Sequence, residues 1–337
     1  MRGASSMPLG LAGGTDEALS IVVLLGGTSP EREVSLAGGK RVADALGRLG
    51  HRVTVLDFDG ESVCQLLSMT PDLVYNALHG GYGEDGCISG LLDVVGLPYT
   101  HSGIAASSIG MNKVFTKHVL RFLHIDHPEF CVLSKEEILS ATEVMPYPFV
   151  IKPISGGSTL GVCAVFSRNE YLGLAAHADV LEDRMIVEKY VSGQEIQTAV
   201  FMDRAIGTME FLFDGRVYSY DAKYTEGLCR HIFPANIPSD VYDLTIKWAS
   251  KLHRYLGCKT LSRVDFRYDG ANRELKLLEI NTHPGMTACS AFPEILQLRC
   301  GLDFDQVVDL VVKDSIRADG SCGERIDALM ELGQIRV

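Results

Sequence analysis

Short apolar runs alternate with helix-like segments over residues 21–101, and this alternation constrains the fold more than any other feature of the sequence. The strand-like runs lie at 21–27, 51–58 and 72–78, with helices predicted between them at 29–50 and 61–69. Ser29 is suited to cap the first helix, and Pro30 suits its first turn. Strands and helices that alternate at this length predict a parallel sheet with helices on both faces.

The pattern changes after the YTHSG turn, which ends the first unit near residue 101. Residues 102–187 mix helices and strands, including one long helix predicted over 107–123, and strand-rich segments dominate from residue 188. We therefore predict an α/β protein whose C-terminal part is α+β. Its predicted divisions are a loose tail at 1–20 and domains at 21–101, 102–187 and 188–337.

The charge and cysteine content narrow the class of protein. The 337-residue chain has a formal net charge of −12, which opposes binding to nucleic acid. Its nine cysteines include no C-x-x-C pair, so we expect a reducing cytoplasm rather than a disulfide framework. The first 20 residues lack the pattern of a signal peptide, and we expect no membrane-spanning segment.

The segment HGGYGEDG at 79–86 contains three glycines in the G-x-G-x-x-G spacing of dinucleotide-binding turns. Glu84 and Asp85 stand inside that turn, where carboxylates would repel a pyrophosphate. No acidic residue follows about 20 positions on to bind a ribose. An NAD-dependent oxidoreductase is therefore the weakest enzyme hypothesis, and a tight turn that presents His79 and Glu84 is favoured.

A small-residue loop, SGGSTLG at 155–161, follows Lys152 at the end of a strand-like run. Small residues let backbone N–H groups approach phosphate oxygens, and the lysine adds positive charge. A plain Gly/Ser hairpin explains this loop equally well on its own. The sequence contains no G-x-x-x-x-G-K-[ST] phosphate loop.

Two strand-like runs around the turn signal DGAN contain the strongest cluster of candidate site residues. The two-residue period of a strand places Arg263 and Asp265 on one face of the first run, and Glu279 and Asn281 on one face of the second. The turn sets Asp265 almost opposite Glu279, where like charges need a cation between them. Hard oxygen ligands select Mg²⁺ or Mn²⁺. The alternative is a solvated charged hairpin, but Glu279 lies inside the apolar run LKLLEIN.

The polar stretch YDAKYTEG at 220–227 lies between strand-like segments. Its Lys223 and Tyr224 are candidates for a lid over the site. Taken alone, the stretch is better explained as an exposed loop.

Taken together, these segments resemble the D-alanine–D-alanine ligases of the ATP-grasp superfamily. The resemblance runs from about residue 21 to 305 through GGTSPEREVSL, HGGYGEDG, GLPYTHSG, MNKVFTK, VIKPISGGSTLGV, EKYVSGQE, YDAKY, RVDF and LLEINTHPGMT followed by Ser290. It implies a three-domain ATP-grasp fold, in which the parallel α/β domain comes first and two ATP-grasp subdomains follow.

The resemblance also implies how ATP and metal ions are bound. The implied contacts to phosphates, adenine and ribose are Lys113, Lys152, Ser158, Thr159, Glu188, Lys189, Val191, Glu195 and Lys223. Asp265, Glu279 and Asn281 match the ligands of two Mg²⁺ ions, with Mn²⁺ as a substitute. Thr159 stands where the family usually has a second serine, and it keeps the hydroxyl.

The implied substrates are two D-alanine molecules, bound by Glu31, His79, Lys223, Arg263 and Ser290. In this comparison Glu31 holds the ammonium of the first D-alanine. Lys223 and Ser290 hold the carboxylate of the second.

The catalytic residues implied by the resemblance are Glu31, Ser158, Tyr224, Arg263, Gly285 and Ser290. Arg263 and the Gly285 N–H would cradle an oxyanion, while Ser158 and Tyr224 would hydrogen-bond with Glu31 and tie the lid to the first domain. The implied reaction is ATP-dependent formation of D-alanyl-D-alanine through an acyl phosphate, which supplies peptidoglycan synthesis. A cytoplasmic homodimer that associates through the first domain is also implied.

Two residues depart from the family pattern near the second-substrate pocket. Ala291 stands where a bulky aliphatic residue is common, and Cys289 where histidine is common. They motivate an alternative, an ATP-grasp ligase with a different second amino acid. A non-catalytic ATP-binding regulator is a third hypothesis, which the intact Lys223 and Arg263 oppose. Tyr224 favours a dipeptide over a depsipeptide product, because D-lactate-selecting relatives carry histidine there.

Overall fold

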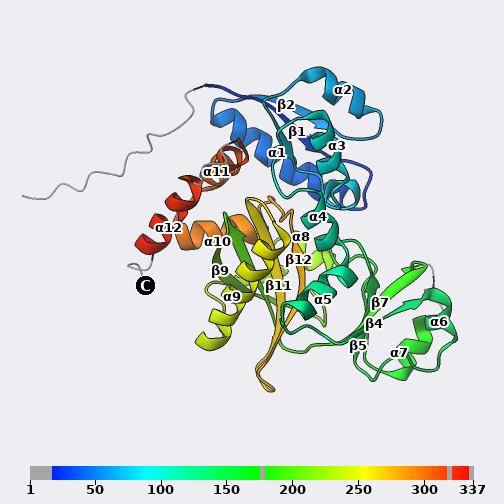
Figure 1. The fold of residues 1–337 in the computed structure, drawn as a ribbon. Helices are drawn as coiled ribbons and strands as arrows, with labels where there is room; N and C mark the ends of the chain where they lie inside the picture. The colour runs from blue at the N-terminus through cyan, green and yellow to red at the C-terminus, as the bar shows by residue number, and fades with distance from the viewer. Residues whose placement is uncertain (1–16, 175–177, 179, 317–320, 334–337) are drawn as a thin grey trace, which may run out of the picture.

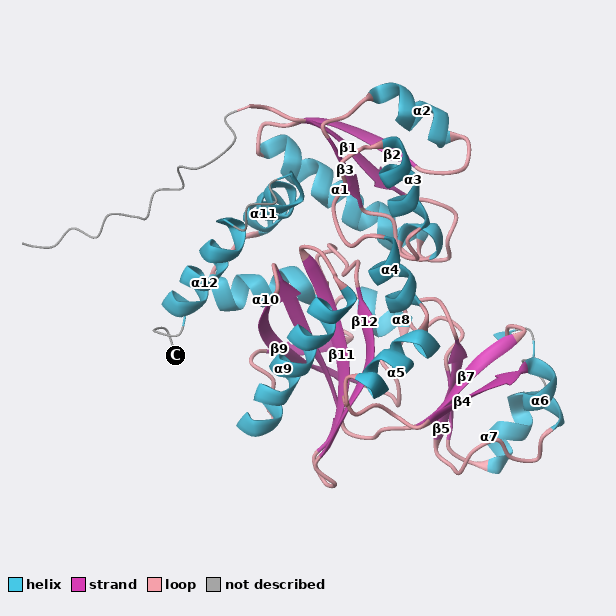
Figure 2. Ribbon diagram, viewed as in Figure 1, coloured by secondary structure: helices cyan, strands magenta, loops and turns pink. Residues whose placement is uncertain are grey.

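The computed structural model describes residues 17–174, 178, 180–316 and 321–333. Within these ranges the chain forms a three-stranded, a four-stranded and a five-stranded sheet, which lie apart in Figure 1 and Figure 2 with their own helices. The mixed α/β architecture confirms the predicted fold class. Most of the tail predicted at 1–20 lies outside the described residues, and the first strand begins at Ser20.

The N-terminal sheet is parallel, in the order β2-β1-β3, as the alternating pattern predicts. Its elements are β1 (Ser20–Leu25), α1 (Arg32–Arg48), β2 (Arg52–Asp57), α2 (Ser62–Met69), β3 (Leu73–Asn76) and α3 (Cys87–Val95). Ile21 and Val23 pack on the side of α1, whereas Val22 and Leu24 pack with α2 and α3. Helices therefore cover both faces of the sheet.

The first helix begins three residues later than predicted. Glu31 is its N-cap residue, so the prediction that Ser29 caps this helix is wrong. The Ser29 hydroxyl instead accepts a hydrogen bond from the Glu31 backbone N–H at 3.1 Å and donates one to the His79 carbonyl at 2.5 Å. Ser29 thus joins two loops that lie at the carboxyl ends of β1 and β3.

The single helix predicted over 107–123 is two helices, α4 (Ile104–Met111) and α5 (Lys113–Phe122). Asn112 separates them in an extended conformation, and its side chain caps α5 by accepting from the Phe115 N–H at 3.0 Å. Both helices pack on the five-stranded sheet, although the predicted boundaries place them in the central domain. The boundaries themselves stay a prediction.

The four-stranded sheet is antiparallel, in the order β4-β7-β5-β6. Its elements are β4 (Phe130–Ser134), α6 (Lys135–Ser140), β5 (Phe149–Pro153), β6 (Cys163–Val165), α7 (Arg168–Gly173) and β7 (Arg184–Lys189). Ser134 and Glu137 form a capping box that fixes the start of α6. β7 continues through the boundary predicted between residues 187 and 188.

The five-stranded sheet is antiparallel, in the order β10-β9-β8-β11-β12. Its strands are β8 (Gln194–Phe201), β9 (Arg204–Phe213), β10 (Cys229–Ile232), β11 (Leu261–Asp269) and β12 (Glu274–Asn281). The helices of this part are α8 (Tyr220–Tyr224), α9 (Ser239–Leu256), α10 (Ala291–Cys300), α11 (Phe304–Ile316) and α12 (Ser321–Gly333). One hydrophobic core contains residues of α1, α10 and α11, so the N-terminal part packs against the part of the chain that holds the five-stranded sheet.

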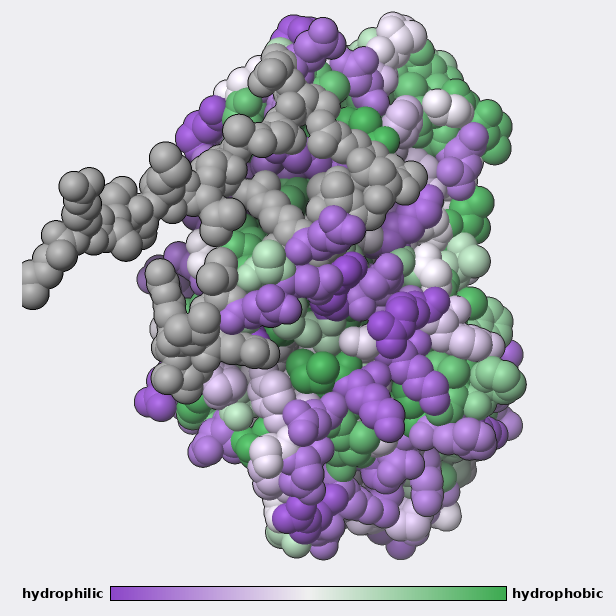
Figure 3. Space-filling view, turned by 60° about the vertical axis from the view of Figure 1, so that its left-hand side comes forward, coloured by the Kyte–Doolittle hydropathy of each residue, from purple (hydrophilic) through white to green (hydrophobic). Residues whose placement is uncertain are grey.

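The surface mixes polar and apolar residues over most of the face shown in Figure 3, and apolar residues gather toward its upper right. Large apolar side chains exposed in the N-terminal part include Val55, Leu67 and Val94. None of the helices within the described ranges combines the length and apolar character needed to cross a bilayer.

Replacing Gly193 with alanine should weaken the fold at the start of β8. Gly193 has φ +92°, and a Cβ there would lie 2.1 Å from the Tyr268 carbonyl oxygen. Left-handed strain and a backbone clash together should lower the free energy of unfolding by about 3 kcal/mol. Gly227→Ala is the matched control, because Gly227 has φ +85° with open space around it. Urea unfolding midpoints should fall much further for Gly193→Ala, and equal falls would contradict the clash.

Candidate active site

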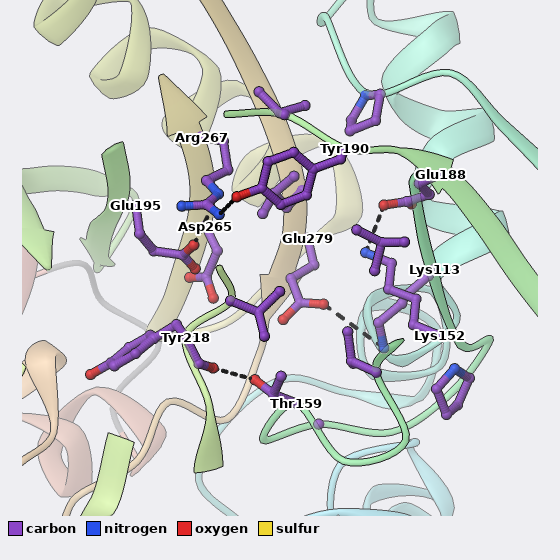
Figure 4. A pocket seen from close by; sticks show the side chains of 18 of the residues that line it. Lys113, Lys152, Thr159, Glu188, Tyr190, Glu195, Tyr218, Asp265, Arg267 and Glu279 are labelled. Carbon is purple, nitrogen blue, oxygen red and sulfur yellow. Dashed lines mark hydrogen bonds and ion pairs between the residues drawn. The ribbon is translucent and has the colours of Figure 1, made fainter. Parts of the chain in front are cut away.

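A cavity lies between the four-stranded and five-stranded sheets (Figure 4). β5 and β7 supply Lys152 and Glu188 to one wall, and β11 and β12 supply Asp265 and Glu279 to the other. The predicted nucleotide-binding residues that line it are Lys113, Lys152, Thr159, Glu188, Lys189, Val191, Glu195 and Lys223. Ser158, the remaining member of that set, lines the adjoining pocket described below.

Buried ion pairs hold the lysines on one side of this cavity. Lys152 Nζ lies 2.7 Å from a Glu188 oxygen, and Lys117 Nζ lies 3.2 Å from the other. Burial alone would raise the pKa of Glu188, but the two lysines outweigh it and the pKa is lowered. Glu188 therefore remains a carboxylate that positions two ammonium groups.

Lys117 is a residue of this site that the sequence analysis missed. Its ammonium is fully buried and donates to the Leu278 carbonyl at 2.9 Å, as well as pairing with Glu188. Burial lowers its pKa to about 8, against the opposing effect of Glu188. The available signal was its spacing from Lys113, because residues four apart on a helix share a face.

The loop between β5 and β6 is held in an uncommon backbone conformation. Gly156, Ser158 and Thr159 have φ values of +116°, +50° and +63°. Non-glycine residues rarely adopt positive φ values, and the residues that do so are concentrated in functional loops. The Gly156 carbonyl accepts from Lys113 Nζ at 2.6 Å, and Thr159 Oγ1 donates to the Tyr218 carbonyl at 2.6 Å. The loop thus contacts both sides of the cavity.

The β11–β12 hairpin has the register predicted from the two-residue period. Asp265 pairs with Glu279, and Arg263 pairs with Asn281. The register shifts between Asp265 and Phe266, so Leu278 is an extra residue in β12. This bulge places Leu278 and Glu279 together on the cavity wall.

The oxygen atoms of this hairpin suit a hard divalent cation. Arg263 donates to both oxygens of Asp265 at 2.7 and 2.8 Å, whereas the ion pair from Lys113 to Glu279 spans 3.8 Å. Burial opposes ionisation of Glu279, but Lys113, Lys152, Lys223 and Arg263 together lower its pKa to about 2. Two carboxylates and the Asn281 amide therefore provide ionised and neutral oxygen donors side by side, a set that fits Mg²⁺.

A second pocket adjoins the first and shares Gly157, Tyr218, Lys223 and Glu279 with it. The predicted substrate and catalytic residues that line this pocket are Glu31, His79, Ser158, Lys223, Tyr224, Arg263, Gly285 and Ser290, together with Asn281. All the side chains predicted for amino-acid binding are thus brought together. Cys289 and Ala291 also line this pocket.

Three hydroxyl and carboxyl groups form a chain across the second pocket. Ser158 Oγ donates to Glu31 in a short hydrogen bond and lies 2.8 Å from the Tyr224 hydroxyl. Glu31 comes from the segment between β1 and α1, Ser158 from the loop between β5 and β6, and Tyr224 from α8. Burial and the Glu84 charge raise the pKa of Glu31, while Ser158 and Lys223 act in the opposite sense.

The HGGYGEDG loop faces the second pocket rather than the nucleotide cavity. His79 Nδ1 lies 2.8 Å from a Glu84 oxygen, and both side chains are buried. Burial alone would lower the pKa of His79. Its hydrogen bond to Glu84 and the charges of Glu84 and Glu31 outweigh burial, so the pKa is raised above the ordinary value. The glycine-rich turn thus presents the hydrogen-bonded His79 and Glu84 to the pocket.

The turn after β12 forms the remaining wall. A Cβ on Gly285 would lie 2.8 Å from Ser290 Oγ, so glycine permits the close approach. Ser290 Oγ accepts from the Thr287 N–H at 3.0 Å, and Arg41 of α1 donates to the Thr287 carbonyl at 2.8 Å. The N-terminal body therefore supports this turn directly.

His101 adopts φ +75° and stacks on His283 with ring centroids 3.9 Å apart. Burial lowers the pKa of His101 to about 3. The two neutral rings join the end of the N-terminal domain to the turn after β12.

A cleft between two antiparallel sheets that opens onto a pocket rich in charged groups is the arrangement of an ATP-grasp fold. A family profile described as "D-ala D-ala ligase C-terminus" matches residues 118–313. Relatives named D-alanine–D-alanine ligase include one from Anaplasma marginale (strain Florida), 71% identical over 96% of this chain and 97% of its own. Another, from Wolbachia pipientis wMel, is 47% identical over 88% of this chain and 95% of its own.

Solved structures agree with this assignment. The D-alanine–D-alanine ligase of Bacillus anthracis aligns with a TM-score of 0.75 and 26% identity, over 89% of this chain and 98% of its own. The same enzyme complexed with ATP aligns with a TM-score of 0.75 and 25% identity, over the same shares of the two chains. The chain belongs to the D-alanine–D-alanine ligase family.

Proposed function

We propose that this protein joins two D-alanine molecules into D-alanyl-D-alanine with ATP as the energy source. The observation that carries the proposal is the contact between its two pockets, which share Lys223 and Glu279. A nucleotide in the first cavity would direct its terminal phosphate toward an amino acid in the second. The Bacillus anthracis relative complexed with ATP supports the choice of nucleotide.

The first step transfers a phosphoryl group. A carboxylate oxygen of the first D-alanine attacks the γ-phosphorus of ATP, the bond to the β-phosphate oxygen breaks, and ADP leaves. Glu31 binds the ammonium of this D-alanine through a charge-assisted hydrogen bond. Lys113 and Lys152 lie on the cavity wall, where their charge stabilises the transferring phosphoryl group.

The second step forms the peptide bond. The amine of the second D-alanine attacks the acyl phosphate carbonyl, and inorganic phosphate leaves from the tetrahedral intermediate. Arg263 and the Gly285 N–H stabilise the oxyanion of that intermediate. Ser290 and Lys223 bind the carboxylate of the second D-alanine. The chain from Glu31 through Ser158 to Tyr224 keeps water away from the acyl phosphate.

Asp265, Glu279 and Asn281 would hold two Mg²⁺ ions, with Mn²⁺ as a substitute. Such ions neutralise charge on the phosphates and orient them. Arg263 occupies both oxygens of Asp265, so this carboxylate is oriented whether or not a metal is bound.

The proposed function is tested by measuring ADP formation with purified protein, ATP and Mg²⁺. ADP should appear in proportion to D-alanine, with D-alanyl-D-alanine as the product by mass spectrometry. L-Alanine serves as the control and should give no dipeptide. ATP turnover without D-alanine dependence would exclude the proposal.

A ligase with a different second amino acid is the alternative. A cavity of about 430 Å³, lined by both polar and apolar groups, adjoins the amino-acid pocket and shares Lys223, Cys289 and Ser290 with it. Together with the small Ala291, this space would accept a larger second substrate. Competition between D-alanine and D-serine, D-lactate or larger D-amino acids distinguishes the two. Preferential use of another acceptor would favour this alternative over a ligase that makes D-alanyl-D-alanine.

We also propose that the protein acts in the cytoplasm as a homodimer associated through the N-terminal domain. The exposed Val55, Leu67 and Val94 of that domain support such an interface. Light scattering that gives a monomer mass at micromolar concentration would contradict the dimer.

A further inference from the structure

A short segment between β9 and α8, residues 214–219, crosses from the five-stranded sheet to the four-stranded sheet, and we call it the strap. Arg216 of the strap contacts the part of the chain that contains the four-stranded sheet, through its guanidinium group. The guanidinium carbon lies 4.1 Å from the centroid of the Phe166 ring. Its Nη1 donates to the two oxygens of Glu170 at 3.1 and 3.2 Å. Phe166 follows β6 and Glu170 belongs to α7, so Arg216 links the two walls of the nucleotide cavity.

Glu170 is held in position independently of Arg216. Its Oε2 accepts from the Phe166 N–H at 2.9 Å, and its own N–H donates to the Ser167 side chain that caps α7. The carboxylate and the aromatic ring are therefore fixed side by side before the strap reaches them. Preorganised partners make a weak surface contact more effective, since only the arginine must be ordered.

The backbone of Arg216 is bound as well. Its carbonyl accepts from the Tyr190 hydroxyl at 2.8 Å and from Arg267 Nη2 at 2.9 Å. Tyr190 packs its ring edge against Phe166 at 4.8 Å. Figure 4 shows Tyr190 and Arg267 on the cavity wall, and Val217 of the strap lines the same cavity. The strap therefore forms part of the cavity wall, next to Tyr190 and Arg267.

We propose that Arg216 is a positioning residue that fastens the strap over bound nucleotide and sets the rate at which ADP leaves. The inference rests on the proposed nucleotide site. The side chains of Arg216 and Glu170 are 57% and 39% exposed, so salt screens their attraction. An exposed ion pair of this strength can break in every catalytic cycle, whereas a buried ion pair would slow the release of ADP.

The test measures dissociation of a fluorescent ADP analogue by stopped flow, with Mg²⁺ and without amino acids. Arg216→Ala should release the analogue about 3- to 10-fold faster, because it loses both the ion pair and the cation–π contact. The KM for ATP should rise by a similar factor, while the KM for the first D-alanine stays within twofold. Arg216→Lys keeps the charge but not the planar stacking, and should restore part of the slow release.

Arg48→Ala is the matched control. Arg48 forms a two-point pair with Asp305, is 56% exposed, and does not line the nucleotide cavity. Its removal should leave release unchanged. Added salt should speed release from the unmodified protein by a larger factor than from Arg216→Ala, because only the unmodified protein has the exposed ion pair to screen.

The inference would be overturned if Arg216→Ala released the analogue at a rate within twofold of normal. An equal increase of the release rate in Arg48→Ala would also overturn it. So would the finding that the unmodified protein binds no nucleotide. Failure of the ligase function is a separate result, because release of the analogue is measured without amino acids. An enzyme that binds nucleotide but makes no dipeptide would contradict the proposed function and leave the role of Arg216 to be judged by its release rate.

Discussion

Glu279→Gln should lower the turnover rate by about 1,000-fold or more while leaving the fold intact. The substitution keeps the shape of the side chain and removes one negative charge from the wall shared by both pockets. Loss of a metal ligand at a phosphoryl-transfer site removes several kcal/mol of transition-state stabilisation, and each 1.36 kcal/mol is about tenfold in rate. The measurement is kcat for D-alanine-dependent ADP formation at saturating ATP and Mg²⁺.

The control for this variant is Glu274→Gln, a change on the same strand at an exposed position. It should retain near-normal activity. Circular dichroism and thermal unfolding should match the unmodified protein for both variants. A Glu279→Gln enzyme with more than a tenth of normal kcat would disprove the metal-ligand assignment.

Glu31→Gln should raise the KM for the first D-alanine by about 100-fold, with a smaller effect on the KM for ATP. Glu31 is buried and lies in the amino-acid pocket with His79 and Glu84, so its charge is poorly screened by water. Losing a charged partner for a buried ammonium costs about 1.5–3 kcal/mol, which corresponds to roughly 10- to 150-fold in affinity. Initial rates over a D-alanine series would measure the effect.

Glu33→Gln is its control, because Glu33 lies in the first turn of α1 with an exposed side chain. The KM for D-alanine should not change in that variant. If Glu31→Gln instead raised the KM for ATP and left that for D-alanine unaltered, Glu31 would not be the ammonium partner.

The register of the β11–β12 hairpin is predictable because a local turn and a two-residue period determine it. Asp265 therefore falls opposite Glu279, as expected from the sequence alone. The bulge at Leu278 is not predictable in this way. The Leu278 carbonyl is bound by Lys117, which is 161 residues away in the sequence, so the bulge depends on tertiary packing.

The break between α4 and α5 is a different kind of error, because its signal is local. Asn112 is a strong N-cap residue, yet the apolar pattern continues across it and favours one helix.

The contacts of Ser29 and Arg216 depend on which loops the fold brings together. No pattern in the neighbouring residues indicates that Ser29 would bond to the His79 carbonyl or that Arg216 would stack on Phe166.

The candidate site residues converge on two adjoining pockets because the family motifs lie at strand ends and in loops between sheets. The roles of these residues remain predictions, and the variants above test them. The resemblance implies that Glu188 is one of the contacts to ATP, whereas its carboxylate is paired with Lys117 and Lys152. A backbone contact to adenine at this position remains compatible with those pairs.

The buried position of Lys117 limits how the nucleotide cleft can open. This single ammonium contacts Glu188 on one sheet and a carbonyl of β12 on the other, and it is shielded from water. Separating the sheets at that point would leave buried charges unpaired, at a cost of several kcal/mol. A parallel separation of the two sheets is therefore costly at α5. The exposed pair between Arg216 and Glu170, which also spans the cleft, costs far less to break.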